Sequence, residues 1–382
     1  MATIKKYTKK DGSTAYMFKA YLGTDPVTGK RINKTKQGFK TKKEAQLALA
    51  RLQTEIENSG FRQAERMTFQ QVYDLWVVNY ELTVKESTFV KQTEQYRLHI
   101  LPYFGTRMLD KITPAVVQKF ANQKVKYKRY REFISNTSRI FEYAIRMDLI
   151  RENPVKKIVI PTPPEKLTLD DKNNYFTKDE LMKFLKALDE RENLKQSAFL
   201  RMLAMSGCRR GEILGLEWRS VSFEDNYISI TQTLARGKNR RLYLEQPKTK
   251  SSKREVPLDQ KTMDMLKQWR LQQRKDLLKF GHNSIGDHQL VFSSLEDNSF
   301  IELATPQKWL HTILKQNGLR RITLHGLRHT AATMMLESGL TLKDVSDRLG
   351  HASIEITSDL YIHVTEKRKR ENIDQVMSYL EN

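Results

Sequence analysis

The stretch that decides the fold is Thr323 to Val364, TLHGLRHTAATMMLESGLTLKDVSDRLGHASIEITSDLYIHV. His325 and Arg328 stand three residues apart, so on a helix their side chains share one face and can bind one ligand. A second helix is predicted to begin after Thr341, which is placed as its cap, and to end at Gly350. The pattern predicts a basic pocket that contains a histidine and is built from short helices.

The sequence after Gly350 carries two further candidate residues. His351 follows directly, and Ser353 is placed to cap a last short helix. The positions that recur at helical spacing on this helix are Ile354, Thr357 and Tyr361. Tyr361 is therefore expected close to the pocket.

Two earlier segments complete a pattern with this stretch. The first is SGCRRGE at residues 206–212, and the second is PKTK at residues 247–250. With HGLRH at 325–329, LGH at 349–351 and a tyrosine ten residues later, they resemble the signature segments of the tyrosine recombinases, the phage-integrase family. The resemblance runs from about residue 175 to the end of the chain.

The resemblance implies six catalytic residues, which are Arg209, Lys248, His325, Arg328, His351 and the nucleophile Tyr361. In this family the tyrosine attacks a DNA phosphodiester and forms a 3′-phosphotyrosyl intermediate. The residue types suit that chemistry, because arginine forks bind phosphate oxygens in a bidentate manner. A phenol with a pKa near ~10 needs a group that takes its proton, and the departing 5′-oxygen needs a general acid.

Two of these roles have alternatives in the sequence. His325 is the preferred proton acceptor for the tyrosine, and His351 is the alternative. Lys248 is the preferred general acid, and the cationic residues that lie near it on the predicted turn are Lys250, Lys253 and Arg254.

Neighbours of the candidate residues are given structural roles. Glu212 is expected to orient Arg209 through a buried ion pair, and Arg210 is expected at the surface. Cys208 is the one cysteine of the chain, which excludes an internal disulfide, and it is expected to be a buried packing residue.

A zinc site is not predicted. His325 and His329 lie four residues apart, but position 326 is glycine where the metalloprotease motif has glutamate, and no third ligand follows at a suitable spacing. His329 is interpreted as structural. The sequence therefore predicts neither a metal nor another cofactor.

The charge of the chain predicts a polyanionic partner. Among 382 residues, 67 are Lys or Arg and 45 are Asp or Glu, so the net charge is +22. Phosphate contacts by Lys and Arg dominate nucleic-acid affinity, and double-stranded DNA fits this excess; a ribosomal or otherwise basic surface is the alternative. No signal-peptide core or run of 18 apolar residues occurs, so we expect a cytoplasmic protein of a bacterial host, associated with the nucleoid and without membrane contact.

The predicted fold class is multidomain α+β, in four parts. Residues 1–60 predict a basic three-stranded sheet with one helix, which resembles the arm-type DNA-binding domain of temperate-phage and conjugative-transposon integrases. Residues 66–158 predict a four-helix core-binding domain, and the Pro-rich residues 159–173 predict a linker. Residues 174–382 predict a mostly helical catalytic domain with a small antiparallel sheet.

Some element boundaries are specific enough to be tested. Strands are predicted at 3–8, 14–22 and 31–39, and a helix from 87 to 100 that ends before Pro102. In the catalytic domain, the strands predicted at residues 227–233, 242–246 and 253–258 are expected to form one three-stranded sheet.

By resemblance, the expected function is site-specific recombination by an integrase that joins a mobile element, such as a prophage or an integrative transposon, to a bacterial chromosome. The expected assembly is a homotetramer on DNA, bound at core and arm attachment sites, with a host bending protein and an excision factor as further partners. The alternatives are a topoisomerase of type IB and a DNA-binding regulator on an inactive recombinase scaffold.

Overall fold

The computed structural model describes residues 3–9, 11–24, 31–59, 66–163, 174–246 and 253–350. The chain divides into two compact units: residues 1–78 with 95–161, and residues 79–94 with 162–382. No helix within the described ranges is both long and apolar enough to span a membrane. The domain boundaries at residues 60, 66, 158 and 174 stay predictions.

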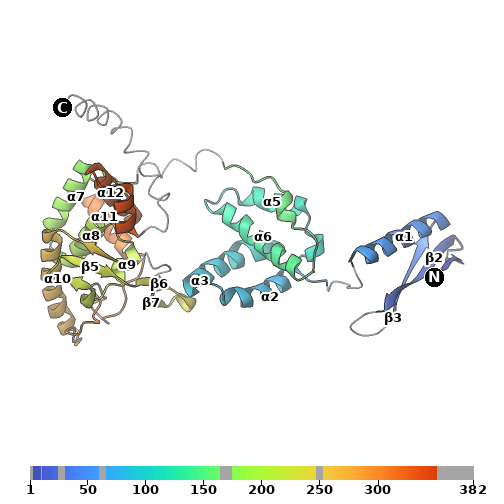
Figure 1. Ribbon diagram of the computed structural model, residues 1–382, viewed down its shortest axis with the longest axis horizontal. Coiled ribbons are helices and arrows are strands. Elements are labelled where there is room, and N and C mark those ends of the chain that lie inside the picture. Colours follow the sequence, from blue (N-terminus) through green and yellow to red (C-terminus); the bar gives the residue numbers. More distant parts are fainter. Residues whose placement is uncertain are drawn as a thin grey trace, which may run out of the picture. The chain divides into compact units, whose positions relative to one another are not determined.

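The N-terminal segment, residues 3–59, is a sheet with one helix across it (Figure 1). Its elements are β1 Thr3–Thr8, β2 Thr14–Thr24, β3 Arg31–Phe39 and α1 Lys42–Ser59, with antiparallel strands in the order β1-β2-β3. Helix α1 begins directly after Thr41, whose hydroxyl accepts a hydrogen bond from the backbone N–H of Glu44. Phe18 and Ala20 of β2 pack against Ala45 of α1 in a small core.

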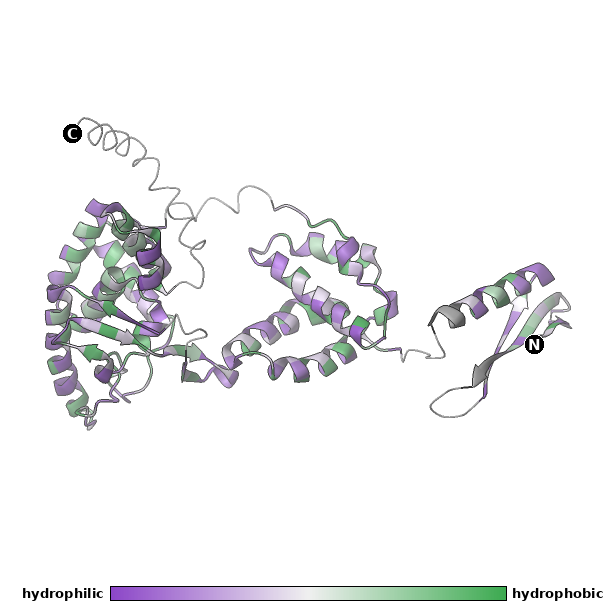
Figure 2. Ribbon diagram, in the orientation of Figure 1, coloured by the Kyte–Doolittle hydropathy of each residue, from purple (hydrophilic) through white to green (hydrophobic). Residues whose placement is uncertain are grey.

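The helical segment, residues 66–163, has an aromatic core. Its longer helices are α2 Phe69–Glu81, α3 Glu86–Gln95, α5 Pro114–Lys124 and α6 Tyr130–Arg146. Phe69, Phe104 and Phe120 are fully buried, and the Phe69 ring lies 5.4 Å from that of Phe104. In Figure 2 hydrophilic and hydrophobic residues alternate along α6, as expected of a helix with one face on a core.

One predicted boundary in this segment is wrong. The helix expected to end before Pro102 continues through a π-helical turn, Tyr96–Ile100, into α4 Leu101–Phe104. Pro102 stands in the first turn of α4, where a missing N–H costs no helical hydrogen bond. The wider π turn places Tyr96 and Ile100 in the core, where both are fully buried.

The C-terminal segment, residues 174–350, is mostly helical. Its helices are α7 Lys178–Asp189, α8 Leu194–Ser206, α9 Arg210–Leu214, α10 Gln260–Lys279, α11 Thr305–Gln316, α12 Leu324–Glu337 and α13 Leu342–Leu349. Helix α8 is buried on nearly all sides and packs against α7, α10, α11 and α12. A helix of that kind belongs in the middle of a core, and α8 ends at Ser206 with Gly207 as its cap, two residues before Arg209.

The strands of this segment differ from the prediction. Strands β4 Val221–Ser222, β5 Tyr227–Ile230 and β8 Arg254–Pro257 form one sheet, whereas β6 Thr233–Arg236 and β7 Leu242–Glu245 form a separate hairpin. The single predicted sheet is therefore wrong in its pairing. The run after residue 227 breaks at Gln232, whose side chain donates to the carbonyl of Gly215, so that the chain leaves the first sheet before the hairpin begins.

The start of α7 carries an ion pair that makes stability depend on pH. Thr177 and Glu180 form a capping box, and Arg320 donates to Glu180 Oε2 at 2.9 Å. The hydrogen bond from Arg320 is the main reason that the pKa of Glu180 falls from 4.5 to about 2. Because the folded pKa lies below the unfolded one, this contribution is present above about pH 4.5 and is lost as the pH falls toward 2.

Replacing Glu180 with Gln should therefore lower the free energy of unfolding by about 1 kcal/mol at neutral pH, after allowance for the partial exposure of the pair. The difference from the unmodified protein should shrink as the pH falls from about 4.5 toward about 2. Urea unfolding at several pH values measures this difference. The control is Lys186→Gln, which removes the exposed ion pair of Lys186 with Glu190. A difference that stays constant with pH would contradict the role of the carboxylate.

Candidate active site

A pocket of about 370 Å³ lies where α9 meets the start of α12. Its lining includes three of the predicted catalytic residues, which are Arg209, His325 and Arg328. Arg209 and Arg328 stand 119 positions apart in the chain, so the fold brings them together. The pocket is thus basic and contains a histidine, as the sequence predicts.

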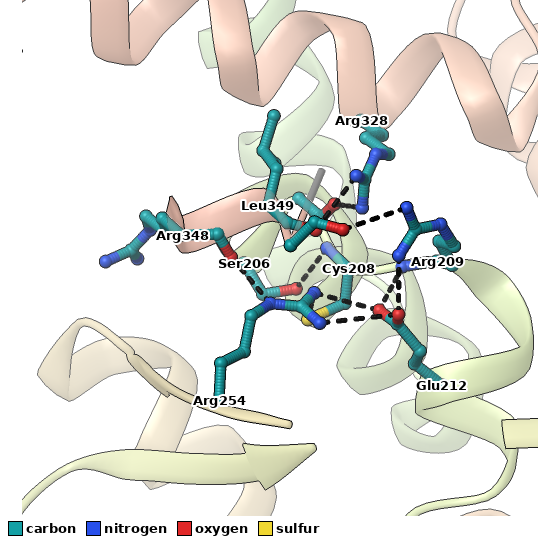
Figure 3. Close-up of polar contacts among 10 residues, drawn as sticks. Ser206, Cys208, Arg209, Glu212, Arg254, Arg328, Arg348 and Leu349 are labelled. Carbon is teal, nitrogen blue, oxygen red and sulfur yellow. Dashed lines mark hydrogen bonds and ion pairs between the residues drawn. The ribbon is translucent and has the colours of Figure 1, made fainter. Parts of the chain in front are cut away.

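Arg328 is buried on α12, which begins after the cap Thr323. Its guanidinium donates to the carbonyl of Gly207 at 2.9 Å and to the carbonyl of Leu349 at 2.9 Å (Figure 3). Burial, and next the charge of Arg209, lower the pKa of Arg328 to about 10. Arg328 therefore keeps its positive charge at neutral pH in a fixed orientation.

Arg209 is held by Glu212 and remains open to solvent. The backbone N–H of Arg209 donates to Glu212 Oε2 at 2.8 Å, and Nη1 of the side chain donates to Oε1 at 2.9 Å. The Arg209 side chain is 46% exposed, whereas that of Glu212 is 6% exposed. The predicted ion pair is confirmed, but only its carboxylate is buried, and part of the Arg209 fork is left free to bind a ligand.

Glu212 is ionised although it is buried. Burial raises the pKa of this carboxyl, but hydrogen bonds and charges from Arg254 and Arg209 outweigh the burial and hold the pKa below its usual value. A buried carboxylate that is hydrogen-bonded by two arginines has its charge compensated, and it fixes the orientation of both side chains.

His325 lies on the same helix as Arg328, and its side chain is exposed at the mouth of the pocket. Burial lowers the pKa of His325 below 6.5, and the charges of Arg328 and Arg209 lower it further. The ring meets that of His329 edge to face, with centroids 4.4 Å apart. At neutral pH His325 is therefore neutral and able to accept a proton.

The segment around Gly350 is the third part of the site. Gly350 ends α13 as predicted, in the left-handed conformation with φ +67°. Arg209 Nη2 donates to its carbonyl at 3.1 Å. Three predicted catalytic residues, Lys248, His351 and Tyr361, lie outside the described residues.

The sequence analysis missed part of the pocket. Arg210 was expected at the surface, but it is half-buried and lines the pocket beside Arg209. Gln307 of α11 also lines it, and its side-chain carbonyl accepts from the N–H of Leu324 at 2.9 Å, at the start of α12. No local signal marks Gln307, because it reaches the pocket only through the packing of α11 on α12. Cys208 is buried, as predicted.

Comparisons with known proteins agree with this geometry. The family model described as phage integrase family matches residues 174–368, the phage integrase N-terminal SAM-like domain matches 68–125, and the arm DNA-binding domain matches 3–56. The fold and the basic pocket thus define a recombinase of the tyrosine class. The chain belongs to the phage integrase family.

Individual relatives align with most of the length of this chain. A "Tyrosine recombinase XerC-like" protein of Caldanaerobacter subterraneus subsp. tengcongensis is 31% identical over 96% of this chain and 96% of its own length. The Tn1549 transposon integrase, solved in complex with transposon right end DNA, has 21% identity and a TM-score of 0.64 over 81% of this chain and 99% of that one. A lambda integrase tetramer bound to a Holliday junction has 19% identity and a TM-score of 0.58 over 93% of this chain and 94% of that one.

Proposed function

We propose that this protein is a site-specific DNA recombinase that integrates and excises a mobile element through a 3′-phosphotyrosyl intermediate. The observation that carries the proposal is the convergence of Arg209, Arg328 and a neutral His325 on one pocket. Two fixed guanidinium groups provide the donors that a five-coordinate phosphorus needs when its non-bridging oxygens gain charge.

In the proposed reaction the phenol oxygen of Tyr361 attacks the DNA phosphorus, and His325 takes its proton. The bond from phosphorus to the 5′-oxygen breaks, and Lys248 gives that oxygen a proton. Arg209 and Arg328 stabilise the charge on the non-bridging oxygens, and His351 helps to bind the same phosphate. A 5′-hydroxyl from the partner strand then attacks the phosphotyrosine, so the energy of the original bond is kept for rejoining.

The proposed partners are the core and arm attachment sites in double-stranded DNA, in a homotetramer that joins two DNA segments. A net charge of +22 supports a large contact with phosphates. A host bending protein and an excision factor are proposed as further partners, in the cytoplasm of a bacterial host.

Recombination between two DNA molecules tests the function. The protein is incubated in EDTA with two plasmids that carry the attachment sites flanking its gene, and recombinant joints are amplified and sequenced. Joints at one fixed position support the proposal. Relaxation of a single plasmid without joints would favour the topoisomerase, and binding without either product would favour the regulator.

The pH dependence of cleavage should follow His325. Because its pKa is lowered, the neutral form persists below pH 6.5, and the cleavage rate should stay level from about pH 8 to about pH 6.5 before it falls. Single-turnover cleavage of a nicked core site measures the profile, and His325→Gln should be slow with no such fall. A decline centred above pH 6.5 in the unmodified protein would contradict the assignment.

The N-terminal segment should control binding to arm sites. Deleting residues 1–60 should weaken arm-site affinity by at least about tenfold, because the phosphate contacts of its lysines are lost, and leave core-site affinity within about threefold. Gel shifts on separate arm and core duplexes at one salt concentration measure both. An equal loss at the two sites would show that the segments do not have separate roles.

A further inference from the structure

Three arginines bind the last carbonyl groups of α13. Arg254 Nε donates to the carbonyl of Arg348 at 2.7 Å, Arg328 to that of Leu349 at 2.9 Å and Arg209 to that of Gly350 at 3.1 Å (Figure 3). The final carbonyls of a helix have no partner within the helix and carry its negative end, so cations stabilise them. Arg209 and Arg328 belong to the proposed catalytic set, but Arg254 does not.

Two cationic residues that follow the predicted turn of Lys248 are described by the structure, Lys253 and Arg254, and Arg254 is the more buried of the two. Its side chain is 7% exposed, whereas Lys253 is exposed. Arg254 stands at the start of β8, paired with Ile230 of β5, so the sheet fixes its backbone. It therefore cannot reach the solvent side of the pocket to act as the general acid, and a different role is required.

The guanidinium of Arg254 also binds the carboxylate that holds Arg209. Its Nη2 donates to Glu212 Oε2 at 2.9 Å and to the Cys208 sulfur at 3.6 Å, while Nη1 lies 3.4 Å from Glu212 Oε1. Glu212 bonds Arg209 through the same two oxygens. The carboxylate is thus clamped between two arginines, and its position depends on both.

Gly350 shows how closely Arg254 approaches the end of α13. A Cβ atom at this position would lie 2.9 Å from Arg254 Nη1, and the backbone has a φ of +67°, which favours glycine. Arg254 therefore packs directly against the residue that precedes His351. One side chain links the strand after the lysine turn, the carboxylate behind Arg209 and the end of α13.

We propose that Arg254 is a positioning residue for DNA cleavage, which acts through Glu212 on the Arg209 fork. The inference rests on the proposed recombinase function, since it assigns Arg209 a contact with the DNA phosphate. A misplacement of about 1 Å in a reacting group costs on the order of 10²-fold in rate. A loss of that size is expected when Arg254 is replaced by a residue without donors.

The test measures three quantities for each variant: the single-turnover cleavage rate on a nicked core site, the dissociation constant for the intact core site, and the melting temperature. The nicked site is used because product accumulates on it even when cleavage is slow. Arg254→Met should slow cleavage by about 10²-fold with DNA affinity within about threefold. Arg254→Lys keeps a charge opposite Glu212 but lacks the fork that contacts both carboxylate oxygens, so the carboxylate holds Arg209 less firmly and about tenfold slower cleavage is expected.

Arg201 provides a matched control in the same segment. Its side chain is 6% exposed and bonds Asp189, Asp259 and Thr262, away from the pocket. Arg201→Met should lower the melting temperature, and at a temperature where it is folded it should cleave within about threefold of the unmodified protein. Equal rate losses in the Arg201 and Arg254 variants would mean that Arg254 is only structural, and would overturn the proposal.

A double variant decides whether Arg254 acts through Arg209. In an Arg209→Lys background, Arg254→Lys should cost less than about threefold further, because the fork that it positions is already gone. A full tenfold loss on top of Arg209→Lys would overturn the proposal. If the unmodified protein forms no adduct on the nicked site, the recombinase function itself fails, which separates the two results.

Discussion

Replacing Tyr361 with Phe is expected to abolish cleavage while DNA affinity stays within about twofold. The change removes one oxygen, which is the nucleophile of the proposed reaction, and leaves the apolar ring in place. The intermediate requires an oxygen placed in line with the leaving 5′-oxygen, and the variant has none at position 361. The expected rate is therefore below detection.

The measurement pairs cleavage of a nicked core site with a gel shift on the intact site. Tyr227→Phe is the matched control, since it removes the same atom from a residue on β5 outside the pocket, and it should cleave at the unmodified rate. Cleavage by the Tyr361 variant at more than a trace of the normal rate would refute the assignment of the nucleophile.

Replacing Arg328 with Met is expected to slow cleavage by at least about 10²- to 10³-fold, the usual cost of removing a preorganised donor from a developing negative charge. The same change deprives the carbonyls of Gly207 and Leu349 of their donor. Two buried acceptors without partners should lower the free energy of unfolding by about 1–3 kcal/mol. The rate must therefore be measured at a temperature where the variant is folded.

The companion variant is Arg328→Lys. It retains a charge beside the phosphate, but its compact ammonium group lacks the planar fork that spans both carbonyls and a phosphate oxygen, so an intermediate rate is expected. Methionine and lysine variants that cleave equally well would show that the charge is irrelevant. Cleavage by Arg328→Met within about threefold of normal at saturating DNA would remove Arg328 from the proposed mechanism.

Local signals in the sequence predicted the ends of helices that build the site. Thr341 caps the start of α13 and Gly350 ends it, because each signal acts within one helical turn. The ion pair of Arg209 with Glu212 was predictable for the same reason, since the two residues lie three apart.

Features set by distant parts of the chain were not predicted. The pairing of β6 with β7, separate from β5 with β8, depends on where Gln232 turns the chain toward Gly215. The burial of Arg254 was also not predictable from the sequence, because its neighbour Lys253 has the same charge but is exposed. In both cases the deciding contacts join residues that are far apart in the sequence, and hydrophobic periodicity does not reveal such contacts.

The central claim is that this basic pocket serves a covalent tyrosine nucleophile, and mapping the adduct tests it most directly. The protein is incubated in EDTA with DNA from either side of its gene, quenched with SDS and digested, and the modified peptide is identified by mass spectrometry. The account predicts DNA joined through its 3′-phosphate to Tyr361. Tight binding with no adduct, repeated on a nicked substrate that traps the intermediate, would contradict it.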